Sequence, residues 1–416
     1  MVSSPRASLP CAVLLVGSEL LDGRVGDLNL KLVARILLDV GIEVLESRAV
    51  PDSTNRVAGA IAELASRYGM VVATGGLGPT CDDVTVTAVA AALHRPLERS
   101  PEAERMLREK YASWEAEVPA TVLRQAFIPL GALPVSNPAG TAPGVVIPGE
   151  TGRGHIILLP GFPSEAEPLL PLCLDALGLK GSAQPPGRRV LRLWGIPEST
   201  LIEGVPGLQE PGGTEVSILP SYGRLDIVLK GAGADRLESE IKELYGSRIY
   251  AASLNFSLEE TLGGLLTDRG LTLSLAESCT GGLVAKLLTD VPGASAWFLG
   301  GVTAYSNAVK TALLGVPVEL LEEHGAVSAE CAAAMALGVR RLTGSGVAGA
   351  VTGIAGPGGA VPGKPVGTVS LAVSGPGDRL VSKDRRFRGA RGVVRSAAAA
   401  WLLGMIYGTL SGEDVS

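Results

Sequence analysis

The chain has 416 residues, of which 46% are hydrophobic and 19% charged, and its formal net charge at pH 7 is −6. This length predicts roughly two to four domains, and the acidic balance excludes a general electrostatic affinity for nucleic acid or an anionic membrane. The five cysteines are widely spaced and there are three histidines, which excludes a disulfide framework, a zinc ribbon and a histidine-rich metal site.

Neither the N-terminal residues nor the longest apolar run, 397–408, has the pattern of a membrane or export signal. The N-terminus lacks the sustained apolar segment of a signal peptide, and the apolar run is shorter than the ~18–20 residues that a membrane span needs. We therefore expect a cytoplasmic protein that does not bind membranes.

The first part of the chain alternates apolar strands with amphipathic helices. Strands are expected at 12–16, 42–50 and 70–73, and helices at 29–41, 54–68 and 84–93. This order predicts a mostly parallel sheet with helices on both faces.

A glycine-rich turn at 75–83 follows the strand at 70–73 and opens a helix, the position at which open α/β sheets bind phosphorylated ligands. Asp82 and Asp83 either hold a divalent ion against a diphosphate, or one of them caps the helix. Two further Gly/Pro loops, 136–144 and 159–165, are expected to line the same crevice.

A change in composition near 184–187 indicates a domain boundary. Strands at 189–194 and 225–229 and a helix at 234–245 follow, without clustered catalytic residue types. They predict a small α+β connecting domain that serves as a spacer or a dimerisation module. A capping box from Ser257 to Glu260 then begins the last domain.

The last domain contains the sequence A-E-S-C-T-G-G at 276–282, between a strand expected at 271–276 and a helix at 281–288. Amide groups near the helix N-terminus are suited to binding an oxyanion or a phosphate. The alternative is that Ser278 or Thr280 is simply the N-cap. A run of arginines further on forms either a basic patch or a solvated face; its members are Arg385, Arg386, Arg388, Arg391 and Arg395.

Nine motifs, in order, resemble the CinA family (competence/damage-inducible protein A) over essentially the whole chain. They are G-S-E-L-L, G-G-L-G-P-T-x-D-D, N-P-x-G-T-A-P-G, L-P-G-x-P-S-E, A-E-S-C-T-G-G, Y-S-N-x-x-K, H-G-A-V-S, T-G-I-A-G-P-G-G and K-P-V-G-T-V. The resemblance implies a three-layer molybdopterin-binding-like domain at 1–183, a connecting α+β domain at 184–256 and an α/β amidase domain at 257–416.

The resemblance implies that the C-terminal domain deamidates nicotinamide mononucleotide without a cofactor. It makes Ser278 the nucleophile and Lys310 the general base, with Tyr305 beside them. A lysine that acts as a base near neutral pH needs its pKa lowered by ~3 units, so the site should be closed and largely dry. Cys279 is the rival nucleophile, but it lacks an activating histidine. The other residues expected to form this site are Glu277, Cys279, Thr280, Gly281, Thr352, Gly353, Arg391 and Arg395.

For the N-terminal domain, the resemblance implies an ADP-ribose pyrophosphatase that uses Mg²⁺ or a similar ion. The expected ligand-binding residues are Gly75, Gly76, Gly78, Thr80, Asn137, Gly140, Thr141, Gly161 and Ser164. The expected metal ligands are Asp82, Asp83, Glu19 and Glu165. Two positions in this domain depart from the family: Ser18 stands where Asp is common, and Cys81 stands where His or Ser is common. A third departure lies in the C-terminal domain, where the family often has Gly-Asp-Arg and this chain has Ala390 at the position of the Asp.

The leading hypothesis is therefore a two-site enzyme of pyridine-nucleotide salvage, acting on nicotinamide mononucleotide and ADP-ribose and forming a homodimer or other homo-oligomer. One alternative is a non-catalytic recruitment protein in DNA uptake or recombination. Another is an amidase whose N-terminal domain senses a ligand, which the loss of a carboxylate at Ser18 favours. Direct binding to nucleic acid is not expected, because the chain is acidic and poor in aromatic residues.

Overall fold

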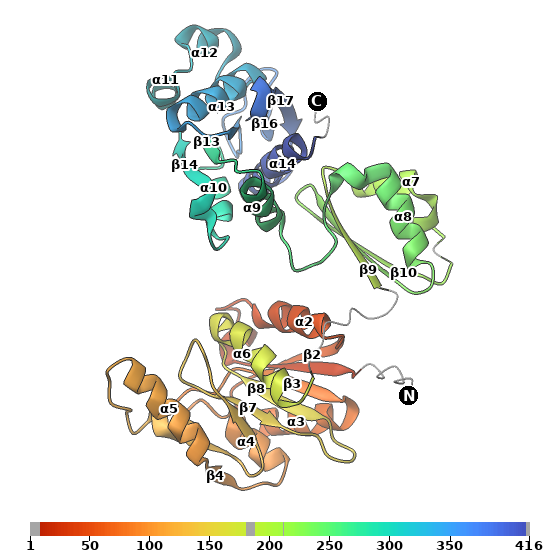
Figure 1. The fold of residues 1–416 in the computed structure, drawn as a ribbon, viewed down its shortest axis with the longest axis vertical. Coiled ribbons are helices and arrows are strands. Elements are labelled where there is room, and N and C mark those ends of the chain that lie inside the picture. The colour runs from red at the N-terminus through yellow and green to blue at the C-terminus, as the bar shows by residue number, and fades with distance from the viewer. Residues whose placement is uncertain (1–8, 180–187, 211, 413–416) are drawn as a thin grey trace. The chain divides into compact units, whose positions relative to one another are not determined.

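The computed structural model describes residues 9–179, 188–210 and 212–412. The chain divides into two compact units, residues 1–186 and 187–416 (Figure 1). The expected boundary near 184–187 lies outside the described residues, so each unit is considered by itself.

The N-terminal unit is built on a six-stranded sheet with the order β2-β1-β3-β8-β7-β6. Its strands are β1 (Cys11–Val16), β2 (Val44–Val50), β3 (Met70–Thr74), β6 (Leu133–Val135), β7 (Gly144–Ile147) and β8 (His155–Leu159). The first four strands in the spatial order are parallel, and β7 is antiparallel to both of its neighbours, β8 and β6. The mostly parallel sheet predicted from the sequence is thus confirmed.

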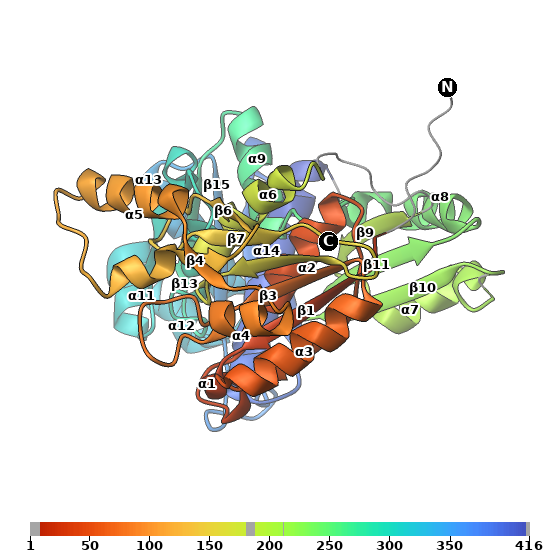
Figure 2. The ribbon, with the colours of Figure 1, turned by 90° about the horizontal axis from the view of Figure 1, so that it is seen from below.

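Helices cover both faces of this sheet, which makes three layers. On one face, α2 (Asn29–Asp39) packs beside α6 (Pro163–Ala176), and on the other, α3 (Thr54–Arg67) packs beside α4 (Thr85–Ala92) (Figures 1 and 2). A separate hydrophobic cluster fills each interface. The remaining elements of the unit are α1 (Ser18–Leu21), β4 (Leu97–Arg99), α5 (Pro101–Ser113), η1 (Val122–Ala126) and β5 (Phe127–Pro129).

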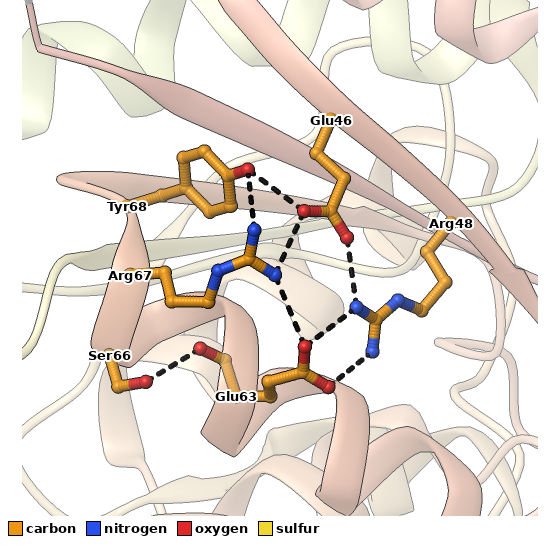
Figure 3. Close-up of polar contacts among 6 residues, drawn as sticks. All are labelled: Glu46, Arg48, Glu63, Ser66, Arg67 and Tyr68. Carbon is orange, nitrogen blue, oxygen red and sulfur yellow. Dashed lines mark hydrogen bonds and ion pairs between the residues drawn. The ribbon is translucent and has the colours of Figure 1, made fainter.

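A network of charged side chains joins the edge strand β2 to α3 (Figure 3). Arg48 Nη1 lies 2.7 Å from Glu63 Oε2, and Arg67 Nη1 lies 3.0 Å from Glu46 Oε2. The Tyr68 hydroxyl donates to Glu46 at 2.8 Å. The hydrogen bonds from Arg48 are the main reason that the pKa of Glu63 falls from 4.5 to about 2.

We expect an NMR titration of the Glu63 carboxyl to give a pKa near 2, and to return it toward 4.5 in Arg48→Met. Because the folded pKa is the lower one, the network stabilises the fold above about pH 4.5. That contribution is lost as the pH falls toward 2. An unchanged titration in Arg48→Met would show that Arg48 does not hold the carboxylate.

The second unit begins with a four-stranded antiparallel sheet of order β10-β11-β9-β12. Its elements are β9 (Arg188–Trp194), α7 (Glu198–Gly204), η2 (Pro206–Leu208), β10 (Glu215–Ser221), β11 (Arg224–Lys230), α8 (Ala234–Tyr245), η3 (Gly246–Arg248) and β12 (Ile249–Ala251). Both predicted strands and the predicted helix are present, in an α+β arrangement.

The rest of the second unit is a five-stranded mixed sheet of order β14-β13-β15-β16-β17, of which β14, β13 and β15 are parallel. The strands are β13 (Leu273–Glu277), β14 (Phe298–Thr303), β15 (Val347–Gly353), β16 (Thr368–Ser374) and β17 (Leu380–Arg386). The elements α11 (Asn307–Leu314), α12 (Val318–His324) and α13 (Ala329–Thr343) enclose one hydrophobic cluster, while α9 (Leu258–Asp268), α10 (Leu283–Thr289) and α14 (Arg391–Ser411) contribute to another. Two short turns, η4 (Ala294–Ala296) and η5 (Pro376–Asp378), complete it. The predicted capping box at Ser257 and Glu260 is confirmed at the start of α9.

Helix α14 has the length and composition of a membrane span, but 72% of its apolar window is buried inside the protein. Its Trp401 ring meets the ring of Trp194 on β9 edge to face, with the centroids 6.2 Å apart. Gly404 approaches Trp194 so closely that an added Cβ would lie 2.3 Å from the ring. We interpret α14 as the core helix that packs the connecting sheet against the last domain.

Candidate active site

A cleft of about 560 Å³ lies at the carboxyl ends of the parallel strands in the N-terminal unit. Gly75 and Gly76, which follow β3, both have positive φ angles. A Cβ on Gly75 would lie 2.1 Å from the carbonyl oxygen of Val16, so this turn requires glycine for space as well as for conformation. The turn therefore brings its backbone directly to the edge of the cleft.

The structure brings most, but not all, of the expected N-terminal residues to this cleft. Those that line it are Gly75, Gly76, Gly78, Thr141, Gly161, Glu19, Asp82, Asp83 and Glu165. Thr80, Asn137, Gly140 and Ser164 are not among the lining residues. Asn137 braces the neighbouring loop, donating to the Ala142 carbonyl at 3.0 Å and to Glu165 Oε2 at 2.7 Å.

Neither Asp82 nor Asp83 caps α4, so that alternative is wrong. The N-cap residue is Val84, without a side-chain cap. The Thr80 hydroxyl instead lies 2.5 Å from a carboxylate oxygen of each aspartate. The hydrogen bond between the Thr80 hydroxyl and Asp82 is the main cause that lowers the pKa of Asp82. Both carboxylates are thereby fixed at the mouth of the glycine turn.

Within the described residues, no three His, Cys, Asp or Glu side chains converge on one point as a closed metal site would require. The four expected carboxylates nevertheless share one cleft with the glycine turn. Mg²⁺ is commonly held by one or two carboxylates together with substrate phosphates and water. The residues present fit an ion of that kind, with Asp82 and Asp83 as the adjacent pair.

Asp52 also lines the cleft, although its Pro-Asp-Ser sequence indicates only a turn. Its carboxylate accepts a hydrogen bond from the Ser18 amide at 2.7 Å, and its own amide donates to the Ser18 hydroxyl at 3.2 Å. Asp52 thus supplies a carboxylate beside Ser18, the position at which the resemblance implies one. The sequence position of Asp52 indicates this placement: it follows β2, which is parallel to β1, and ligands bind at the carboxyl ends of such strands.

In the second unit, Ser278 and Lys310 meet at the carboxyl ends of β14, β13 and β15. The Ser278 amide donates to the Val351 carbonyl at 2.9 Å, which ties the residue to β15. Lys310 projects from α11, whose N-cap residue Ser306 accepts from the Val309 amide. Lys310 Nζ lies 3.3 Å from Ser278 Oγ and 3.0 Å from the Ala304 carbonyl oxygen.

This pair is almost fully buried, with Ser278 at 7% and Lys310 at 2% exposure. Removal from water disfavours the ammonium form, and it is the main cause that lowers the pKa of Lys310 below 10.5. The burial of the pair agrees with the expectation of a closed site. A serine hydroxyl beside a lysine of lowered pKa is the arrangement that nucleophilic catalysis without histidine requires.

Glu277 has a role that the sequence did not reveal in detail. Its buried carboxylate accepts hydrogen bonds from the amides of Gly282, Val284 and Ala285 at 2.8–3.1 Å. The N-cap of α10 is Gly282, so the prediction that Ser278 or Thr280 is the cap is wrong. The carboxylate takes this place because the strand ends directly beneath the first turn of the helix.

The hydrogen bonds within this turn leave two amides for an oxyanion. The Gly281 amide donates to the Ser278 carbonyl, so it is already engaged. The amides of Cys279 and Thr280 have no acceptor among the described residues. These two amides, directly after the serine, are the donors that suit an oxyanion.

We expect Glu277→Gln to lower the free energy of unfolding by ~1–3 kcal/mol and to reduce turnover, because an amide cannot accept three charge-assisted bonds as a carboxylate does. Denaturant unfolding and kcat should be measured together. Glu330→Gln, a change in the first turn of α13 at an exposed position, is the matched control. Equal stability of the two variants would contradict this role.

Cys279 is a poor nucleophile in this setting. Burial raises the pKa of its thiol to about 11, which keeps it protonated near neutral pH. Its Sγ would lie 3.1 Å from a Cβ at Gly353, so the sulfur occupies the space that this glycine leaves. The position of Cys279 is therefore that of a packing residue.

Tyr305 directly follows Ala304, whose carbonyl accepts from Lys310. It is 61% exposed, and no polar contact among the described residues joins it to Ser278 or Lys310. Its hydroxyl instead lies 3.0 Å from Arg391 Nη2, while Arg391 Nη1 donates to the Gly356 carbonyl.

The remaining expected residues surround the turn. Arg395 donates to the Thr280 carbonyl at 2.6 Å and lies near Gly281. The buried Thr352 hydroxyl donates to the Ala326 carbonyl at 2.7 Å, which anchors the end of β15. Arg391 and Arg395 are thus the cationic groups on the side of α14 nearest the turn.

The chain therefore combines a three-layer α/β domain of the molybdopterin-binding class with an α/β domain that buries a serine–lysine pair. Residues 12–178 match the family described as "Probable molybdopterin binding domain", and residues 255–410 match "CinA C-terminal domain".

The "CinA-like protein" of Chlorobium luteolum is 39% identical over 408 residues, which cover 91% of this chain and 94% of that one. That of Citrifermentans bemidjiense is also 39% identical, covering 94% and 96%. A crystal structure of competence/damage inducible protein CihA from Agrobacterium tumefaciens is 40% identical over 36% of this chain and 90% of its own, with a TM-score of 0.35. The chain belongs to the CinA family.

Proposed function

We propose that the C-terminal domain hydrolyses the carboxamide of nicotinamide mononucleotide, releasing ammonia and the acid nucleotide. The observation that carries this proposal is the 3.3 Å approach of Lys310 Nζ to Ser278 Oγ inside a buried site. The family resemblance supplies the substrate.

In this mechanism, neutral Lys310 accepts the Ser278 proton while Oγ attacks the carboxamide carbon. The amides of Cys279 and Thr280 stabilise the oxyanion, and the protonated lysine gives its proton to the departing nitrogen as the C–N bond breaks. Water then attacks the acyl-enzyme with the same lysine as base, which releases the acid and restores the serine. No cofactor is needed. Arg391 and Arg395 are proposed to bind the substrate phosphate.

For the N-terminal domain, we propose hydrolysis of the ADP-ribose diphosphate bond in the cleft beside Gly75 and Gly76. A divalent ion would be held by Asp82 and Asp83, with Glu19, Asp52 and Glu165 nearby in the same cleft. Its chemistry would be neutralisation of the diphosphate charge. The glycine turn would bring backbone amides to the phosphates.

A ligand-sensing N-terminal domain is the second candidate for this cleft. Ser18 is the feature that motivates it, because it stands where the resemblance implies a carboxylate; Asp52, which lies beside Ser18, is the feature that opposes it. In either case we propose a cytoplasmic homo-oligomer, whereas recruitment in recombination would need a protein partner.

Two assays on the purified chain test these proposals separately. Ammonia and the acid nucleotide should appear from nicotinamide mononucleotide in the absence of metal. AMP and ribose 5-phosphate should appear from ADP-ribose once Mg²⁺ is added. Absence of the first activity would refute the amidase proposal, and binding of ADP-ribose without its hydrolysis would favour the sensing role.

A further inference from the structure

The rim of the N-terminal cleft carries large apolar side chains that no part of the described domain covers. Phe162 is 71% exposed and Leu28 is 67% exposed, the two highest values among the large hydrophobic residues described. Both line the cleft, together with the exposed Val25. Apolar surface concentrated at the mouth of a pocket is typical of a ligand contact.

The loops that carry Phe162 and Leu28 are tied together. The side chain of Asn29, which follows Leu28, donates to the carbonyl of Gly161, which precedes Phe162, at 2.7 Å. Asn29 is itself buried, and this bond is partly buried. The two apolar side chains are therefore held on adjacent, fixed backbones.

The same loop also lies against the glycine turn. A Cβ added to Gly161 would make van der Waals contact with the Cα of Gly75 at 3.5 Å, so the two loops approach each other to within about one methyl group. Phe162, the next residue, lines the same cleft as the glycine turn at the proposed phosphate position. A ligand with a diphosphate at that position and a flat ring at one end would span both features.

The identity of residue 162 is not explained by helix stability. Phe162 is the N-cap of α6 and makes no side-chain cap, although serine, threonine, aspartate and asparagine are strongly preferred at such a position. It also stands at the variable position of the L-P-G-x-P-S-E motif. A residue that neither caps the helix nor packs in the core is consistent with a contact to something outside the chain.

We infer that Phe162 and Leu28 form the base-binding wall of the N-terminal cleft, which takes a nucleoside diphosphate derivative with its aromatic base against Phe162. This inference rests on the proposed nucleotide specificity of that cleft. Stacking of a base on an aromatic side chain is worth ~1–3 kcal/mol, or roughly 5- to 150-fold in affinity.

Calorimetry with full-length protein and Mg²⁺ tests it, using two non-hydrolysable probes. Adenosine 5′-(α,β-methylene)diphosphate carries the base, and methylenediphosphonate lacks it. We expect Phe162→Ala to lower the affinity for the adenosine probe about tenfold and to leave the affinity for the base-free probe unchanged. Phe162→Tyr should restore affinity, and Leu172→Ala, at an exposed position on the same helix, is the matched control.

The outcomes are distinguishable. If the wild type binds neither probe, the proposed function of the cleft fails and the inference fails with it. If the wild type binds the adenosine probe, the inference alone fails in either of two cases. The first is that Phe162→Ala binds that probe equally well, and the second is that it binds both probes with equally reduced affinity. A change in molar mass on light scattering, without a change in affinity, would instead identify the apolar rim as a contact between copies.

Discussion

Ser278→Ala is expected to lower ammonia release from nicotinamide mononucleotide by at least about 10⁴-fold, because removal of the nucleophile from a comparable catalytic unit has an effect of this order or greater. Oγ of Ser278 is the hydroxyl that lies within reach of Lys310 Nζ. The turn itself is held by the backbone and by Glu277, so the variant should fold normally.

Cys279→Ala is the matched control for this prediction, since it removes the neighbouring nucleophile-type side chain. The Cys279 thiol has a pKa of about 11 and is buried, so turnover should stay within a few-fold of the wild type. Thermal unfolding and mass spectrometry of the acyl-enzyme should accompany the kinetics. If Cys279→Ala is silent while Ser278→Ala remains active, the nucleophile is the cysteine.

Local sequence signals predicted elements whose determinants lie within a few residues. The helix expected at 234–245 is α8 (Ala234–Tyr245), and the capping box at Ser257 is present. The approach of Ser278 to Lys310 also followed from the sequence, although by resemblance to a family rather than from periodicity. Two parallel strands end beside each other, so residues that follow them meet at one edge of the sheet.

Side-chain partners from other parts of the fold were not predictable in the same way. Sequence spacing left Ser278 and Thr280 as candidate caps, whereas the buried Glu277 carboxylate lies beneath the helix and takes that place. Tyr305 is five residues from Lys310 but faces Arg391 on α14. Such contacts depend on how distant segments pack.

The N-terminal cleft illustrates the same limit. The glycine turn was recognisable because its conformation requires Gly75 and Gly76. The bracing role of Asn137 was not, because its partners Ala142 and Glu165 are fixed by the fold of the loop and the position of α6. Asp52 was missed because a carboxylate in a Pro-Asp-Ser turn is ordinarily a turn former.

Lys310→Met is expected to reduce deamidation by ~10²–10⁴-fold, the usual contribution of a general base. Methionine keeps an unbranched side chain of similar length, so the buried space stays filled. In the wild type, kcat/KM should rise with pH through the Lys310 pKa, which burial lowers below 10.5. Lys286→Met, at an exposed position on α10, should leave activity unchanged.

The same variant tests the cost of burying the lysine. Because the folded pKa of Lys310 is lowered, the unfolded chain binds one more proton than the folded chain between that pKa and 10.5. The contribution of Lys310 to stability should therefore rise with pH across this window, and its penalty is present in full below it. Lys310→Met should lack this contribution, whereas Lys286→Met should keep it. Denaturant unfolding of both variants at several pH values measures the difference: the same pH dependence in the two variants would mean that Lys310 is not buried in its neutral form, and the proposed general base would lose its physical basis.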